Sequence, residues 1–281
     1  MGGAIRPGAD GRRVTRRLAA CAAACALLST GRQEPRPQVS SPQAPRPDSA
    51  VGVAVPWAVG EYLEYSVKFG ILHAGSARMQ VTGKDTLRGH SVWKVHFNIT
   101  GGIPFLRVDD SIDSWMDVGT LNSLRFMQDL SEPRNRALRV YDIFPERGIF
   151  TQNGKPDRPT VENPLDDASF FFFVRTIPLV VGQTYTFPRY FDATANPVIV
   201  KVLRKDTAEV AAGRFPSIVV QPIIKTGGVF SEGGQAEFWF TDDNRRILVQ
   251  LKTRLSFGSL NLYLRKFSGT QAVTDSAQPR R

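Results

Sequence analysis

Apolar and polar residues alternate with a period of two over most of the chain. The segment 61–69, EYLEYSVKF, places Leu, Tyr, Val and Phe at positions 63, 65, 67 and 69, with Glu, Ser and Lys between them. The segments 92–99, VWKVHFNI, and 249–257, VQLKTRLSF, repeat the pattern. This alternation is typical of antiparallel strands with one buried face and one solvated face.

Further strand candidates are separated by glycine-containing turn signals such as FGILHAGS and LRGH. They are 76–83, 107–117, 123–130, 136–144, 184–191, 197–204, 216–224, 235–241 and 260–267. The pattern predicts a mainly β fold, an antiparallel curved sheet or an open β-barrel of about ten to twelve strands.

One segment, PLDDASFFFFVRTIPL, departs from the alternation and predicts a short helix over about residues 166–177. Phe170, Phe173 and Val174 fall on one helical face, Asp166 or Asp167 is placed to cap the helix, and a proline at 178 is placed to end it. We expect this helix to cover one side of the sheet.

The two ends of the chain have different compositions. Residues 1–31 combine a cationic stretch, RRVTRR, with an apolar run, LAACAAACALL, and then small residues, which predicts a secretory signal peptide. Residues 32–56 are rich in Pro, Gln and Ser, which predicts a disordered tether. We expect a single β-rich domain over 57–267 and a disordered tail over 268–281.

Both cysteines lie in the signal segment. LAAC ends at Cys21 and AAAC ends at Cys25, and each resembles a lipobox, in which a lipidated cysteine becomes the new N-terminus. Cleavage near residue 31 and lipidation, at Cys25 or Cys21, both stay open. In either case the predicted mature domain contains no cysteine for a disulfide, a thiolate nucleophile or a metal site.

The charge of the chain argues against a nucleic-acid partner. The net charge is +10, and outside residues 1–31 the chain has 31 basic and 25 acidic residues. These basic residues are scattered, whereas a nucleic-acid surface needs clustered Lys and Arg. We expect no nucleic-acid binding, and contact with a membrane only through a lipid anchor.

Asp242 and Asp243, in the stretch WFTDDNRR, are the first candidates for chemistry. A catalytic pair of carboxylates needs side chains that face each other in different environments. Asp and Asn also bond to their own backbone in turns, and the stretch lies between two predicted strands. The pattern favours a hairpin turn over a pair of catalytic acids.

A second acidic cluster, VDDSIDSWMD, contains Asp109, Asp110, Asp113 and Asp117. On a strand Asp109 and Asp113 share a face, and several carboxylate oxygens could bind calcium. The glycine turn and the distal glutamate of a calcium loop are missing. The pattern favours a charged strand face, paired with arginines such as Arg134, Arg136 and Arg139.

Other catalytic and cofactor signatures are not found. The three histidines, His73, His90 and His96, lack the paired spacing of a zinc site. No nucleophile elbow, phosphate loop or dinucleotide fingerprint occurs. We therefore predict no cofactor, and an enzyme is the less favoured class.

The aromatic residues are the remaining candidates for a binding site. The chain has 18 Phe and 4 Trp. These side chains could simply fill a core under the helix, which is their commoner use. They could also line an apolar pocket between helix and sheet that holds a lipid chain. The pocket-lining candidates are Phe170, Phe171, Phe173 and Trp239.

Several motifs together resemble a bacterial family known as domain of unknown function 3108. They are, in order, VGEYLEYSVKFGILHAGSARMQV, DSIDSWMD, FFFFVRTIPLVVGQTYTFP, EVAAGRFPSIVVQPII and AEFWFTDDNRRILVQLKTRLSFGSLNLYL, and they cover about residues 57–265. The resemblance implies an exported, β-rich envelope protein and no particular reaction. A looser likeness in architecture, to periplasmic lipoprotein carriers built as half-barrels, is analogy only.

These observations predict a non-enzymatic envelope protein, located in the periplasm or associated with the outer membrane. Its expected work is to bind a lipid or a lipoprotein acyl chain in a β-barrel. One alternative is a scaffold that binds another envelope protein through its sheet edges. A second alternative is a hydrolase or metal-dependent enzyme that uses the aspartate clusters.

Overall fold

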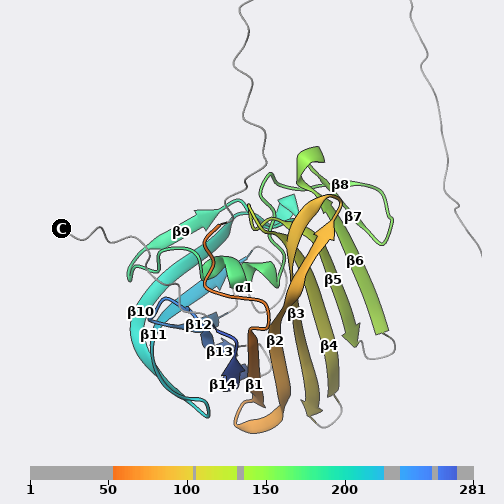
Figure 1. The fold of residues 1–281 in the computed structure, drawn as a ribbon. Coiled ribbons are helices and arrows are strands. Elements are labelled where there is room, and N and C mark those ends of the chain that lie inside the picture. The colour runs from red at the N-terminus through yellow and green to blue at the C-terminus, as the bar shows by residue number, and fades with distance from the viewer. Residues whose placement is uncertain (1–52, 104–105, 132–135, 225–234, 255–258, 271–281) are drawn as a thin grey trace, which may run out of the picture. The chain divides into compact units, whose positions relative to one another are not determined.

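The alternating segments form one antiparallel sheet of fourteen strands, drawn as arrows in Figure 1. The strand order is β8-β7-β6-β5-β4-β3-β2-β1-β14-β13-β12-β11-β10-β9. Each neighbouring pair runs antiparallel. The edge strands β8 and β9 do not pair with each other, so the sheet is open.

The strands differ widely in length. They are β1 (Tyr62–Phe69), β2 (Leu72–Leu87), β3 (His90–Ile103), β4 (Leu106–Asp117), β5 (Ser123–Ser131), β6 (Arg136–Phe144), β7 (Ile149–Gln152), β8 (Arg158–Pro159), β9 (Thr184–Phe187), β10 (Val198–Val210), β11 (Gly213–Ile223), β12 (Gln235–Thr241), β13 (Leu248–Arg254) and β14 (Leu260–Ser268). The helical elements are α1 (Ser169–Val174) and two 3₁₀ turns, η1 (Pro145–Arg147) and η2 (Ala193–Ala195).

The computed structural model describes residues 53–103, 106–131, 136–224, 235–254 and 259–270. All of them belong to one unit, Asp48–Arg281. The predicted signal peptide with Cys21 and Cys25, the tether up to residue 52 and the tail from residue 271 lie outside the described residues.

The predicted fold class, a mainly β open sheet with one α-helix, is confirmed. The predicted count of ten to twelve strands is wrong, because the sheet has fourteen. The two strands without a predicted counterpart are β7 and β8, which have four and two residues. Segments of that length are too short to show an alternating pattern.

The helix is shorter than the predicted 166–177. α1 has six residues, and the residues on either side of it form turns. At its C-terminal end the backbone N–H groups of Arg175 and Thr176 donate to the carbonyls of Phe172 and Phe173. These i to i+3 bonds tighten the last turn and end the helix before the proline at 178.

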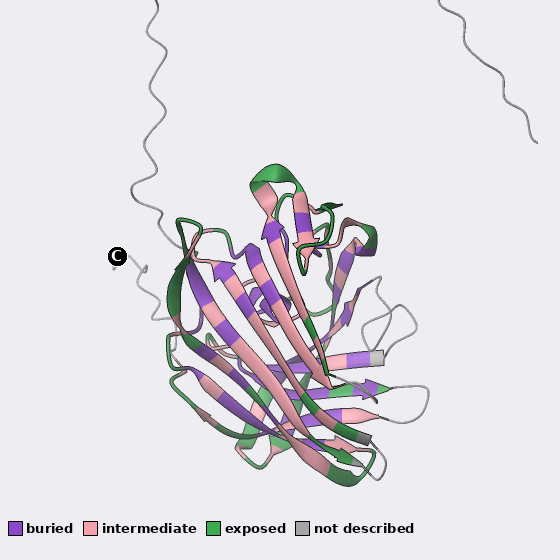
Figure 2. Ribbon diagram, turned by 90° about the vertical axis from the view of Figure 1, so that its right-hand side faces the viewer, coloured by how far each residue is buried: buried purple, intermediate pink, exposed green. Residues whose placement is uncertain are grey.

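The sheet curves around α1, which lies inside the curve in Figure 1. Phe171 stacks on Phe238 of β12, with ring centroids 5.1 Å apart, and Phe173 packs edge-on against Phe187 of β9, at 5.0 Å. On another side of the helix, Trp57 packs against Phe172 at 5.1 Å. Buried residues recur along the strands, as Figure 2 shows in purple.

A buried ion pair joins the end of α1 to the start of β1. The Arg175 guanidinium donates to the Glu61 carboxylate at 2.5 and 2.9 Å, and both side chains are 2% exposed. Arg175 also donates to the carbonyl oxygens of Pro56 and Arg245. The residues just before β1 and the loop after β12 are therefore held against the helix.

No helix in the described part of the chain is long and apolar enough to span a bilayer.

Candidate functional site

Asp242 and Asp243 lie in the connection between β12 and β13, within bend and turn residues. The Asp242 carboxylate accepts from Lys205 at 2.8 Å. The Asp243 carboxylate accepts from the Thr241 hydroxyl and from the backbone and guanidinium of Arg245. Partial burial raises the pKa of Asp243, but these donors outweigh burial and lower the pKa overall. The two carboxylates are thus paired separately, Asp242 with Lys205 and Asp243 with Thr241 and Arg245. They lie in a turn, as predicted.

The four aspartates of the second cluster lie on β4 and divide between its two faces. Asp109 accepts from Arg136 at 3.2 Å, and Arg136 also binds Asp129. Asp113 lies 2.9 Å from the Nδ1 atom of His96 on the neighbouring strand. Asp109 and Asp113 therefore take part in cross-strand pairs, as predicted for a charged strand face. In the described ranges, no group of three or more His, Cys, Asp or Glu side chains is placed to hold a metal.

The remaining members of this cluster have different surroundings. Asp117 bonds to His90 and to the backbone of the β4–β5 connection, where it accepts from Gly119 and Thr120. Asp110 pairs in register with Ile99 of β3 and lines a pocket. The carboxylates of the cluster consequently do not converge on one site.

The aromatic candidates on α1 lie in the core. Phe170 and Phe173 are buried, and Phe171 is partly buried against Phe238. Trp239 lies in β12 between Phe238 and Phe240, and alternation places it on the opposite face of that strand. Its indole N–H donates to Asp206 at 2.9 Å, and its ring lies beneath the Arg204 and Lys252 side chains. None of the four candidate side chains lines the pocket described next.

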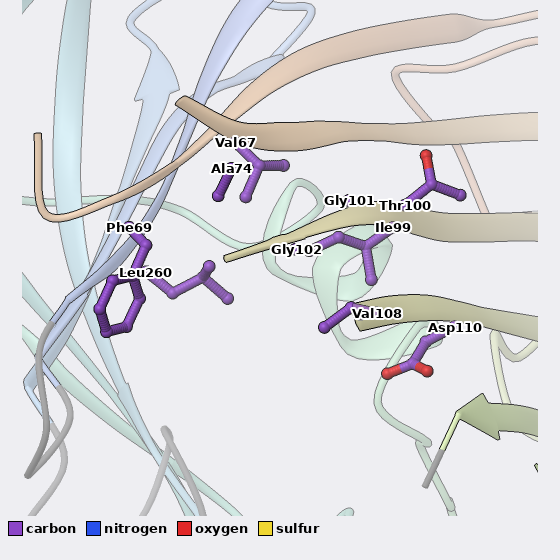
Figure 3. Close-up of a pocket in the computed structure, with 10 residues that line it drawn as sticks. All are labelled: Val67, Phe69, Ala74, Ile99, Thr100, Gly101, Gly102, Val108, Asp110 and Leu260. Atoms are coloured by element: carbon purple, nitrogen blue, oxygen red, sulfur yellow. The ribbon is translucent and has the colours of Figure 1, made fainter. Parts of the chain in front are cut away.

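An apolar pocket of about 230 Å³ lies at one end of five neighbouring strands, β14, β1, β2, β3 and β4 (Figure 3). Its apolar walls are the side chains of Val67, Phe69, Ala74, Ile99, Val108 and Leu260. Among the described residues that line it, Asp110 is the only ionisable one. The rest of the lining comes from Thr100, Gly101 and Gly102.

Two glycines let β2 and β3 approach each other closely beside the pocket. The pairing register runs across four strands through Val67, Gly75, Gly101 and Val108. The two central positions carry no side chain. The φ angles of Gly75 and Gly101 are +153° and +154°, and a Cβ on Gly101 would come 2.0 Å from the carbonyl oxygen of Ala74. Only glycine permits this close approach of β2 and β3.

Asp110 is held in place by the end of β5. One carboxylate oxygen, Oδ1, accepts from the backbone N–H of Ser131 at 2.7 Å and from the Ser131 hydroxyl at 2.6 Å. The Ser131 hydroxyl in turn accepts from the backbone N–H of Asp109. No bond to the other oxygen, Oδ2, occurs among the described residues. In Figure 3 the carboxylate lies beside Val108 at the margin of the pocket.

A separate polar cluster anchors the start of α1. Asp166 is fully buried and accepts from the hydroxyls of Ser114 and Ser123 and from the backbone N–H groups of Ala168 and Ser169. Burial raises the pKa of Asp166, and these four donors act against that rise. This residue therefore fixes the helix start against β4 and β5.

Asp167, the next residue, faces a different set of partners. It accepts from the Tyr190 hydroxyl at 2.9 Å and from the Gln128 amide at 3.2 Å. Burial raises the pKa of Asp167 to about 6, against the effect of the Tyr190 hydrogen bond, and the charge of Asp166 adds to the rise. Within the described part of the chain, no cation is hydrogen-bonded to either carboxylate.

The sequence patterns did not reveal the pocket. The stretch FGILHAGS was interpreted as a turn, whereas the turn is confined to Gly70 and Ile71, and β2 begins at Leu72. Gly75 therefore lies within a strand, opposite Gly101. Two glycines that face each other mark the close approach of β2 and β3 beside the pocket, but finding them requires the strand register.

Comparisons with solved structures place this fold among known ones. The structure resembles a beta-barrel-like protein of domain of unknown function DUF1849 from Brucella abortus, with a TM-score of 0.50 and 12% identity, over 78% of this chain and 100% of that one. At this identity the likeness concerns the fold alone. A protein of Parabacteroides distasonis described as a "putative lipoprotein" matches with a TM-score of 0.34 and 14% identity, over 76% of this chain and 97% of that one.

The sequence comparisons identify a family and no function. No curated protein matches the chain. The family model described as "Protein of unknown function (DUF3108)" matches residues 64–265, which contain all the strands from β2 to β13 and every residue of the pocket. The chain therefore belongs to the DUF3108 family.

Proposed function

We propose that this chain is an exported cell-envelope protein that binds one acyl chain in the pocket at the end of β1 to β4 and β14. The observation that supports this most is the pocket wall, in which six of the lining residues are apolar. Apolar lining with very few polar groups is the usual character of small-molecule pockets. Export is inferred from the signal pattern in residues 1–31.

The size of the pocket restricts the ligand. Its volume of about 230 Å³ lies below the roughly 300–1,000 Å³ of pockets that enclose drug-sized ligands. At about 30 Å³ for each water-sized group, it accommodates seven or eight such groups. We therefore propose that the end of a single acyl chain enters the pocket while the headgroup stays outside.

The alternative functions have less support. A scaffold that binds partners by strand addition could use the part of β10 beyond Lys201, which β9 does not pair, but no feature of the described residues marks a partner there. An enzyme that uses Asp242 and Asp243 needs carboxylates free to act, and both are held by neighbours in a turn. The acyl-chain proposal uses a feature that neither alternative explains.

The test is a titration with n-alkyl alcohols of increasing length that displace a fluorescent acyl probe. Burying each methylene contributes about 0.8 kcal/mol, so affinity should rise roughly fourfold per carbon until the pocket is full and then level off. Val108→Trp fills the pocket and should abolish probe binding. Val140→Trp on β6 is the matched control, because Val140 does not line the pocket.

Two results would overturn the proposal. One is an affinity that does not depend on chain length. The other is probe binding that Val108→Trp leaves at the wild-type level, since the probe would then occupy another part of the surface.

A further inference from the structure

The pocket has a fixed negative charge at its margin, and this limits the headgroups it can accept. We infer that the pocket selects acyl chains whose headgroup donates a hydrogen bond or carries a positive charge, and that it rejects free fatty acids. This inference rests on the proposed function, because it concerns the ligand class of the same pocket. The residue that carries it is Asp110.

The first step of the argument is the orientation of Asp110. Both Ser131 donors bind the same oxygen, Oδ1, at 2.7 and 2.6 Å. The Ser131 hydroxyl is itself fixed, since it also accepts from the Asp109 N–H at 2.7 Å. The carboxylate is therefore held in one position, and Oδ2 is directed to partners other than Ser131.

The second step is the absence of a compensating cation in the pocket wall. The described lining residues include no Lys, Arg or His. Arg136, the first residue of β6, binds Asp109 and Asp129, and alternation along β4 places Asp109 on the face opposite Asp110. The charge of Asp110 thus acts on whatever occupies the pocket mouth.

The third step is the energetic consequence for the ligand. Two like charges a few ångströms apart repel strongly at the border of an apolar site, because water there screens them less than in bulk. A carboxylate headgroup would meet this repulsion. A hydroxyl, an amide N–H or an ammonium group would instead donate to Oδ2, and a charge-assisted bond of this kind is stronger than a neutral one.

The experiment compares three ligands of equal chain length, decanoate, decanol and decylamine, as competitors of a neutral fluorescent acyl probe on the full chain. We expect decylamine to bind most tightly. The affinity for decanoate should be lower than that for decanol by a factor of roughly ten or more. Rising salt should reduce the difference between decylamine and decanoate, because salt screens charges at a solvent-exposed mouth. This salt readout needs no variant.

Two variants separate charge from position. Asp110→Asn removes the charge and keeps an oxygen for the Ser131 donors, so it should bring decanoate and decanol to similar affinities. Ser131→Ala keeps the charge and removes one donor, so the preference against decanoate should persist. Melting curves of both variants verify that they are folded.

The outcomes distinguish the two proposals. If none of the three ligands displaces the probe, the acyl-chain function itself is wrong. If all three bind equally to the wild-type chain at low salt, or if Asp110→Asn retains the full preference, the pocket binds acyl chains but Asp110 does not select the headgroup.

Discussion

At the scale of single residues, Asp166 and Asp167 show how neighbouring carboxylates acquire different roles. Asp166 accepts four hydrogen bonds and ties α1 to two strands. Asp167 accepts two, from Tyr190 and Gln128. The sequence predicted that one of the two aspartates caps the helix, but the N-cap residue is Ala168, and Asp166 binds the N–H groups of Ala168 and Ser169 from two residues before it. The difference between them arises from the tertiary structure, which brings Ser114 and Ser123 to Asp166, and Gln128 and Tyr190 to Asp167.

The raised pKa of Asp167 predicts a pH dependence of stability. Its pKa is about 6 in the folded chain and 3.8 in an unperturbed carboxyl, so the folded state binds this proton more tightly. The stabilisation is complete below about pH 4 and is lost as the pH rises to about 6. Replacing Asp167 with Asn should remove this loss. The free energy of unfolding of the wild type should fall, relative to the variant, by roughly 1–2 kcal/mol across this window.

Urea unfolding at several pH values from 4 to 7 measures this difference. The matched control is Asp242→Asn. In the wild type the Asp242 carboxylate lies at the surface and pairs with Lys205. If the curves for the wild type and Asp167→Asn stay parallel from pH 4 to pH 7, the buried carboxyl does not titrate as stated.

At the scale of elements, the facing glycines Gly75 and Gly101 allow a close contact between β2 and β3. A Cβ at Gly101 would lie 2.0 Å from the carbonyl oxygen of Ala74, and the φ of Gly101 is unfavourable for any L side chain. We expect Gly101→Ala to lower the free energy of unfolding by roughly 2–4 kcal/mol. Thermal or urea unfolding measures the loss.

Gly83→Ala provides the control for this substitution. Gly83 also lies in β2, but an added Cβ there would have nothing within 4 Å. Alanine is favoured over glycine in such a position by roughly 0.5–1 kcal/mol, so this variant should be as stable as the wild type or slightly more stable. Equal losses in the two variants would show that the close approach at Gly101 has no special cost.

The second connection at this scale is the ion pair between α1 and the residues before β1. Arg175→Met leaves the Glu61 carboxylate buried without its partner, which should cost about 3–5 kcal/mol. The double replacement Arg175→Met with Glu61→Gln should recover much of this loss, because no charge then stays buried. Urea unfolding of both variants provides the comparison.

An exposed ion pair is the appropriate control here. Lys205 pairs with Asp242 at 2.8 Å and is 70% exposed, so Lys205→Met should change stability by less than about 1 kcal/mol. If Arg175→Met costs no more than Lys205→Met, the ion pair does not hold the helix in place.

The sequence predicted most elements because long strands with one buried face have a period of two. In β1, for example, the buried apolar residues Leu63, Tyr65 and Val67 alternate in this way. Three features had no local signal. The strand β8 has two residues, the partner of Arg175 lies 114 residues away, and the facing glycines depend on the register of β2 and β3. Each of these depends on contacts between distant parts of the chain.

At the scale of the whole molecule, one open sheet provides both a filled core and a hollow. α1 and its phenylalanines fill the space inside the curve, and the pocket lies near the ends of β1 to β4 and β14. The sequence predicted an apolar site but assigned Phe170, Phe171, Phe173 and Trp239 to it. Composition indicates that aromatic residues are abundant, but it cannot distinguish the core side of a strand from the outer side.

The central claim is that the pocket holds an acyl chain, and native mass spectrometry of the full chain purified from a bacterial envelope tests it most directly. We predict that a single lipid-sized adduct accompanies the wild type and Val140→Trp and is lost in Val108→Trp, which fills the pocket. A bare protein mass in all three samples, or an adduct that Val108→Trp retains, would contradict the account.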